Sequence, residues 1–316
     1  MIDFRYHLVS LIAVFLAIAL GIIIGTTALN EPLQANIEGQ VTELEQDKRA
    51  LEDRTQQLQT QVYSSDAFGE AVAPALVEGA LTGSSVLLIL GNEDVLPEQV
   101  EQVTALITEA GGEVSGTISL RPEYSDPSTA SGLQNFVTGP GMPPAGVELP
   151  ETDDAGQLVG GLLAEVLMVP PAGAAPDGAA ASSVLAGLVA LDAVATEGDS
   201  VAPADYAVVL TSGAFTGEDA ADRNATLVEL VSALDAAGSG AVVSGDTASA
   251  GENGLVGVIR ADPTLSAAVS TVDNVESAAG RISTVLALGG ESEGTSGRYG
   301  NGEDAQPVPP VPATAP

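Results

Sequence analysis

The amino-acid sequence predicts an α/β protein in which a membrane helix and a coiled-coil stalk precede the α/β domain. No charged side chain occurs from Leu8 to Leu29, apolar residues then recur every seven positions, and strand-like and helix-like segments alternate after Ser85. The 316 residues suffice for one sizeable domain with accessory segments. The expected organisation is a cytoplasmic stub (1–7), a transmembrane helix (8–29), a coiled coil (31–63), an extracytoplasmic α/β domain (64–290) and a disordered, acidic and Pro-rich tail (291–316).

The uncharged segment is long enough to cross a bilayer. Leu8–Leu29 has 22 residues, a spanning helix needs about 20, and the apolar part of a signal peptide usually has about 7–15. We therefore expect a retained single-pass helix, although the small residues Thr26-Thr27-Ala28 leave cleavage open. Arg5 precedes the segment and Glu31 follows it, which places the N-terminus in the cytoplasm and the rest outside, in a cell membrane.

Small residues recur every fourth position along this segment. Ala13, Ala17, Gly21 and Gly25 form one stripe that contains a GxxxG pair. Such a stripe lets a second membrane helix approach closely, although chance runs of small residues are common in membrane helices.

Apolar residues recur every seven positions after Pro32. A proline suits the start of a new helix, where its missing N–H costs little. With Ile37, Leu44, Leu51 and Leu58 at d positions, Val41 and Val62 fall at a positions, together with the polar Lys48 and Thr55. This pattern favours a parallel homodimer or a higher oligomer, held on a stalk of roughly 50 Å. The alternative is a single amphipathic helix that packs against its own domain.

The remaining sequence alternates between strand and helix patterns, which predicts a doubly wound, mostly parallel (Rossmann- or flavodoxin-like) domain. The stretch 121–156 is rich in Pro, Gly and Ser, and we expect an excursion or a lid there. Strands are expected at 86–90, 114–120, 206–210, 241–244 and 255–259, and helices at 95–107, 157–169, 182–195, 221–237 and 275–288.

The composition excludes several functions. With 43 acidic and 9 basic residues the formal net charge is −34, which opposes binding to nucleic acid. The chain has no cysteine, and its one histidine, His7, adjoins the apolar segment, so the outer domain cannot hold a Ser–His–Asp triad. No GxGxxG, Walker or GxSxG motif occurs. We expect neither an enzyme nor a bound cofactor.

Carboxylates follow several of the predicted strands. Glu93, Asp94 and Asp246 lie at expected carboxyl ends, where open α/β sheets bind their ligands. They are weak candidates for a Mg²⁺ or Ca²⁺ site. The structural alternative, that they cap helices and form turns, is favoured because Asp and Asn do so routinely at such positions.

Three segments resemble one protein family. The run FRYHLVSLIAVFLAIALGIIIG, the later VSTVDNVESAAGRISTVLAL and the GRYG around Arg298-Tyr299 are similar to the actinobacterial MctB family, named for mycobacterial copper transport protein B. The resemblance extends in layout over nearly the whole chain. It implies an envelope protein of copper efflux and copper resistance, which forms pores and is associated with the mycobacterial outer membrane.

The residues themselves support an anchored, paired module outside the cytoplasm more directly than a pore. Cu(I) prefers thiolate and thioether ligands, and the chain offers only Met1, Met142 and Met168. The expected role in copper transport therefore rests on the resemblance alone. Two functions remain open: copper transport, and a non-enzymatic scaffold or regulator that binds a cell-wall protein through the coiled coil and the α/β domain.

Overall fold

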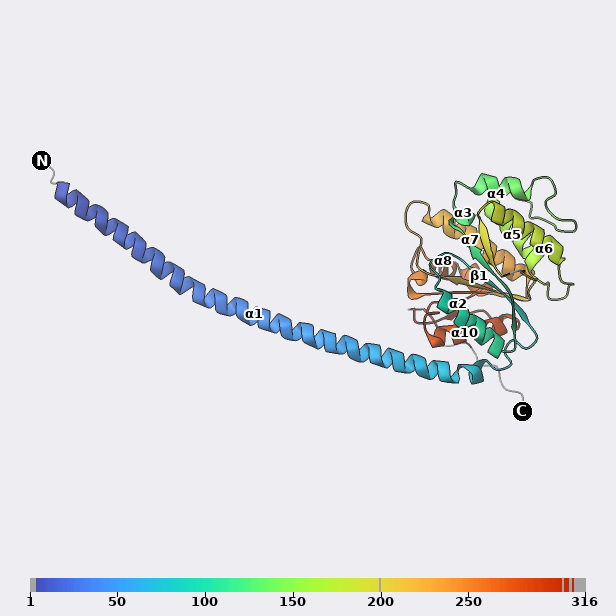
Figure 1. Ribbon diagram of the computed structural model, residues 1–316, viewed down its shortest axis with the longest axis horizontal. Coiled ribbons are helices and arrows are strands. Elements are labelled where there is room, and N and C mark those ends of the chain that lie inside the picture. Colours follow the sequence, from blue (N-terminus) through green and yellow to red (C-terminus); the bar gives the residue numbers. More distant parts are fainter. Residues whose placement is uncertain (1–3, 199, 303, 307–308, 310–316) are drawn as a thin grey trace. The chain divides into compact units, whose positions relative to one another are not determined.

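The computed structural model describes residues 4–198, 200–302, 304–306 and 309, and for residues 26–38 it describes the backbone alone. The chain forms two compact units, Met1–Ser65 and Asp66–Pro316. One long helix, α1 (Phe4–Val77), supplies the described part of the first unit and the opening of the second (Figure 1). The backbone of α1 continues through Pro32, so the helix start that we predicted there is wrong. Pro32 lacks the backbone N–H that an interior helical residue donates, yet the backbone on both sides of it remains helical.

A seven-stranded sheet forms the centre of the second unit, with strand order β3-β2-β1-β4-β5-β6-β7. All neighbouring strands are parallel except β3, which pairs antiparallel with β2. The prediction of a mostly parallel α/β fold is confirmed. The strands are β1 (Ser85–Leu90), β2 (Glu113–Leu120), β3 (Val194–Glu197), β4 (Tyr206–Thr211), β5 (Ala241–Gly245), β6 (Ser270–Val272) and β7 (Arg298–Tyr299).

Helices cover both faces of this sheet (Figure 1). Strand β1 shows why both faces must be covered, since Leu87 and Ile89 enter one apolar core and Val86 and Leu88 enter the other. The last turns of α1, α2 (Pro97–Glu109) and α10 (Ala278–Glu291) cover the face of Val86. The opposite face carries α3 (Pro122–Ser125), α4 (Ala130–Val137), α5 (Ala155–Leu167), α6 (Gly178–Ala190), α7 (Ala220–Ala237), α8 (Leu255–Ala261) and α9 (Pro263–Ala268).

The predicted strand at Leu255–Ile259 is wrong, because these residues begin α8. Its apolar side chains Leu255, Val256 and Ile259 are buried on one side of the helix, a spacing that a short apolar run does not distinguish from a strand. The predicted helix at 182–195 likewise ends early, at Ala190, because its last two residues already belong to the edge strand β3.

Regular structure extends beyond the Gly290 boundary that composition predicts. Helix α10 ends at Glu291, and β7 then adds Arg298–Tyr299 to the sheet. The side chain of Tyr299 is buried, and the carboxylate of Asp273 accepts hydrogen bonds from the N–H groups of Asn301 and Gly302. Disorder from residue 291 onward is therefore wrong for this stretch, because its polar backbone is bound to the sheet.

The end of α1 belongs to the core of the second unit. The Asp66 carboxylate accepts a 2.6 Å hydrogen bond from the N–H of Ala278, at the N-terminus of α10. Glu70 forms a 3.2 Å ion pair with Arg281, and Ala73 and Val77 are buried. Residues 66–77 are thus fixed to α10, whereas the residues of α1 before them belong to the first unit.

Candidate functional site

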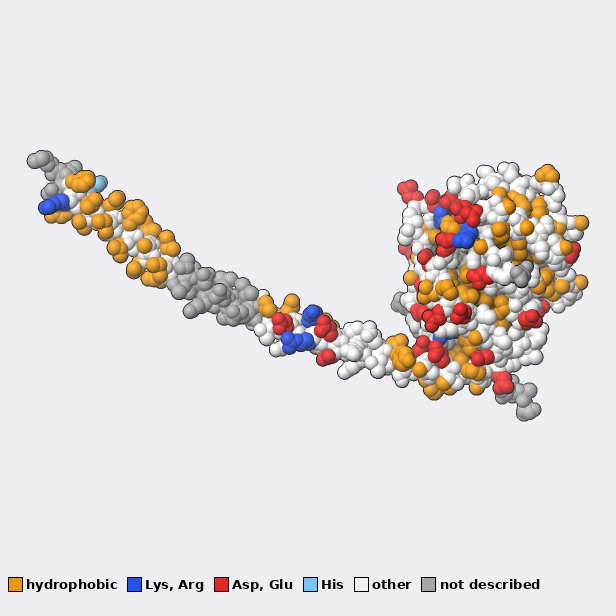
Figure 2. Space-filling view, viewed as in Figure 1, with side chains coloured by type: hydrophobic (Ala, Val, Ile, Leu, Met, Phe, Trp, Pro, Cys, Tyr) orange, Lys and Arg blue, Asp and Glu red, His pale blue; other side chains and the backbone are white. Residues whose placement is uncertain are grey.

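The first candidate site is an apolar helix that could cross a membrane. Among the described residues one stretch, Phe4–Gly25, is long and apolar enough, with a mean hydropathy of 2.9. Its hydrophobic side chains are exposed and cover the visible side of this end of α1 in Figure 2. The predicted packing positions Ala13, Ala17, Gly21 and Gly25 all lie within it, and a side chain built at either glycine would meet nothing within 4 Å. That side of the helix is open to a neighbour.

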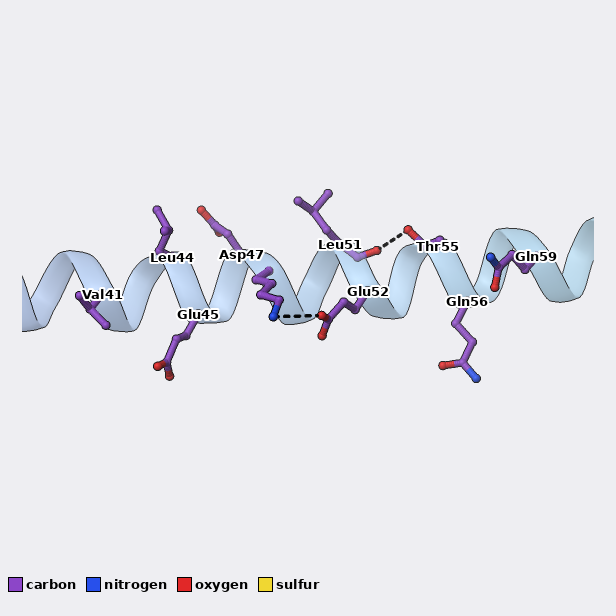
Figure 3. Close-up of a pocket in the computed structure, with 10 residues that line it drawn as sticks. Val41, Leu44, Glu45, Asp47, Leu51, Glu52, Thr55, Gln56 and Gln59 are labelled. Atoms are coloured by element: carbon purple, nitrogen blue, oxygen red, sulfur yellow. Dashed lines mark hydrogen bonds and ion pairs between the residues drawn. The ribbon is translucent and has the colours of Figure 1, made fainter. Parts of the chain in front are cut away.

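The second candidate site is the heptad seam, by which we mean the apolar a and d positions between Val41 and Val62. Leu44 and Leu51 are 73% and 68% exposed and point to the same side of α1 in Figure 3. Val41, Leu58 and Val62 are exposed as well, and the side chain of Ile37 lies outside the described residues. Within the first unit these positions therefore keep large apolar side chains in contact with water.

Charged side chains flank the seam and pair along the helix. Lys48 lies 3.5 Å from Glu52, and Arg49 lies 3.4 Å from Glu45. Both are exposed i,i+4 pairs, each worth a few tenths of a kcal/mol. Lys48 occupies an a position, so a second helix packed on the seam would enclose its stem.

The third candidate site is the topological switch point at the carboxyl ends of β1 and β4, where the strand order reverses and where open α/β sheets usually bind their ligands. The Asn92 amide donates a 2.7 Å hydrogen bond to the carbonyl of Ser212, and the Gly91 N–H donates one of 2.7 Å to the carbonyl of Leu210. The first bond joins the loops that follow the two strands, and the second continues the pairing of β1 with β4. The Asn92 amide is thus engaged by the chain's own backbone.

The predicted metal candidates lie near this edge of the sheet. Asp246 accepts hydrogen bonds from the Ser212 hydroxyl at 2.8 Å, the Gly213 N–H at 3.0 Å and the Ser249 N–H at 2.8 Å, so it caps the short helix η1 (Thr247–Ala250). Glu93 forms an ion pair with Arg121, and Asp94 is exposed. Within the described ranges no three His, Cys, Asp or Glu side chains are grouped so that they could hold a metal ion.

The candidate ligands for Cu(I) do not converge. Met168 is buried in the core of the second unit, and Met142 packs against the same core. His7 is exposed on the apolar helix, and Met1 lies outside the described residues. Each sulfur in the described part of the second unit therefore belongs to apolar packing.

Two carboxyl groups of the second unit titrate near neutrality. Burial, and then the carboxyl group of Asp154, raise the pKa of Glu229 to about 7. Burial also raises the pKa of Glu291 to about 7, although its carboxylate accepts hydrogen bonds from Ser270 and Ser296. Sequence reasoning identified neither residue, because their environments are assembled from segments distant in the chain.

Comparisons with known proteins agree with the sequence resemblance. A family model described as "Copper transport outer membrane protein, MctB" matches residues 1–310. The copper transporter MctB of Mycobacterium tuberculosis (strain H37Rv) is 32% identical over 313 residues, which covers 98% of this chain and 99% of the relative. The copper transporter MctB of Mycobacterium leprae is also 32% identical, over 316 residues, with the same coverage.

Proposed function

This chain belongs to the MctB copper transport family, and from that premise we propose that it is a single-pass envelope protein that serves copper export and copper resistance. The observation that carries the proposal is the end-to-end match to relatives named as copper transporters, which includes the apolar helix. In this proposal the helix is retained, so the α/β domain stays tethered to a membrane.

The proposed orientation places the N-terminus in the cytoplasm and the second unit outside. It is supported by Arg5 before the apolar segment and Glu31 after it. Protease added to intact protoplasts should then remove the second unit. Full protection of this unit, with digestion only after lysis, would reverse the orientation.

The proposed active form is a parallel homodimer. It is supported by the exposed seam residues Leu44 and Leu51 and by the open side at Gly21 and Gly25. A shared membrane anchor aligns two copies in parallel, and the seam and the small-residue stripe can then pair along one continuous helix.

We assign any passage of copper to the membrane helices and their partners, and a binding role without catalysis to the second unit. Support comes from the loops at the carboxyl ends of the strands, where Asn92 binds the loop after β4 and Asp246 joins the loops after β4 and β5. The methionine sulfurs in the described part of this unit are packed in its core, away from any shared ligand position.

Complementation tests the transport proposal. A strain without the gene should be copper-sensitive, and full-length protein should restore resistance. A matched variant keeps residues 31–316 behind an unrelated single-pass helix of the same length and orientation. Transport predicts that this variant fails although it reaches the membrane in equal amounts. Full rescue by the foreign anchor would contradict it.

The second candidate function is a scaffold or regulator that binds a cell-wall protein. The exposed seam favours it, since exposed apolar side chains along a helix suit a protein that acts by contact. Rescue by the foreign anchor, together with in-cell crosslinks from the second unit to one wall enzyme or its regulator, would support this function over transport.

A further inference from the structure

The groove along the heptad seam carries charged groups as well as leucines. Its volume is about 860 Å³, and the residues that line it stand mainly at a, d, e and g positions. Asp47 points to the same side of α1 as Leu44 and Leu51 in Figure 3, whereas Glu45 points to the opposite side. The apolar positions therefore lie between acidic residues, at g on one side and at e on the other.

Asp47 is an exposed carboxylate that its own helix leaves unpaired. Among the described residues it forms no ion pair. The other two acidic residues of the groove do, since Glu45 pairs with Arg49 and Glu52 pairs with Lys48. At a g position Asp47 borders the leucines, where a second helix would pack. Its charge is thus available to a group on that second helix.

Lys48 supplies the positive charge that such a contact needs. It is the only lysine of the chain and occupies an a position, so the d positions lie between it and Asp47 around the helix. In a parallel pair of helices in register, the side chain at an a position enters a hole between four residues of the partner, at positions d, g, a and d. For Lys48 the g residue of this hole is Asp47 of the second copy.

We propose that Lys48 of each copy forms an ion pair with Asp47 of the other, and that these two pairs select a second copy of this chain, parallel and in register, as the occupant of the groove. The inference rests on the homodimer proposed above and names the residues that specify it. In a two-fold symmetric interface each contact occurs twice, so one complementary pair of charges acts on both sides of the seam.

The acidic borders of the groove make the lysine necessary. In the same alignment Asp47 also faces Glu52 of the second copy, because g residues lie opposite the e residues of the next heptad. Two adjacent carboxylates repel each other unless a positive charge lies between them. Lys48 lies 3.5 Å from Glu52 in its own helix and therefore reaches both carboxylates. A shift by one heptad would bring Lys48 beside Gln40 or Arg54 instead, neither of which is negative.

Dimerisation of the full-length protein in detergent tests the pair by charge reversal. Lys48→Glu places a third carboxylate beside Asp47 and Glu52, so it should weaken the dimer about tenfold or more. Asp47→Lys, added to the same chain, returns a positive charge to the site from the other copy and should restore most of the affinity. Analytical ultracentrifugation compares these two variants with the wild-type protein. Glutamate and lysine both favour the helix, so α1 itself should persist in each of them.

Two controls make the same charge changes at b and f positions, away from the seam. Arg49→Glu matches the first substitution and should leave the dimer unchanged. Asp53→Lys, added to Lys48→Glu in place of Asp47→Lys, should not restore the affinity. Equal rescue by Asp53→Lys, or no weakening by Lys48→Glu in a protein that Leu51→Asn dissociates, would overturn the ion pair and leave the homodimer intact. A monomeric wild-type protein would contradict the homodimer itself, and with it a second copy as the occupant of the groove.

Discussion

The two units differ in how far they expose leucine side chains. Leu51 in the first unit is 68% exposed, whereas Leu88 in the second is fully buried between sheet and helices. Complete burial of a leucine is worth about 1.5–3 kcal/mol. The second unit buries most of its large apolar residues in two cores of its own, so we expect it to fold without the first. The first unit keeps its apolar residues exposed, as expected if it enters a bilayer and pairs with a second helix as we propose.

The largest effect is expected from removal of residues 1–65, which takes away the unit with the exposed apolar residues and leaves the unit with the buried core. The remaining residues 66–316 keep α10 and the end of α1 that packs on it, so they should fold, stay monomeric and leave the membrane fraction entirely. Fractionation and sedimentation of the truncated protein measure this. A truncated protein that aggregates or stays membrane-bound would show that the second unit also depends on partners.

The second-largest effect is expected from Leu51→Asn, which should weaken the proposed dimer. Two leucines lose their burial in each dimer, so dissociation should become about 100-fold easier or more, equivalent to about 3–6 kcal/mol. Analytical ultracentrifugation in detergent measures the change. Gln46→Asn, two positions from the seam at Leu44, is the control and should leave the association unchanged. Equal effects of the two substitutions would exclude the heptad seam.

A third test concerns the pH dependence of the second unit alone. Burial raises the pKa of Glu291 from its ordinary value of 4.5 to about 7, so the folded state binds this proton more tightly than the unfolded state. Its contribution is fully present below pH 4.5 and is lost as the pH rises through 7, a change of about 3 kcal/mol. Glu291→Gln, which keeps an acceptor for the Ser270 N–H, should remove this part of the slope. Urea unfolding between pH 4.5 and 8 measures it, and parallel curves for both proteins would contradict the assignment.

The smallest predicted effect is at the junction of α1 with α10. Glu70→Gln removes the 3.2 Å ion pair with Arg281, whose side chain is buried and also donates to the carbonyl of Glu276. Because Glu70 itself is exposed, the loss should be about 1 kcal/mol or less in the free energy of unfolding. Glu78→Gln is the control on an exposed carboxylate nearby. A larger loss in the control would contradict a stabilising role for this pair.

The sequence predicted best those elements whose pattern is local. The uncharged run from Leu8, the buried strands β1, β4 and β5, and helix α7 all follow from periodicity or from continuous apolar composition. The capping role of Asp246, favoured as the structural alternative, was likewise predictable, because an aspartate after a strand often caps the next turn.

Elements defined by distant contacts escaped prediction. Strands β6 and β7 are short and partly polar, and they become strands because β6 pairs with the edge of β5 and β7 pairs with β6. One cavity of the second unit is lined by Tyr124, Asp154 and Glu229, which are spread over about a hundred residues and which no spacing rule connects. Polar groups of this kind are recognised only when burial and hydrogen-bond partners are known.

Crosslinking of single cysteines in intact cells tests the central claim most directly, namely that the exposed face of the first unit is covered by a second copy. The chain has no cysteine of its own, so Leu51→Cys and its control Asp53→Cys report one position each. We predict rapid disulfide-linked dimers from position 51 and few from position 53, which faces away from the seam. Equal crosslinking at both positions, or none at position 51, would contradict the paired stalk.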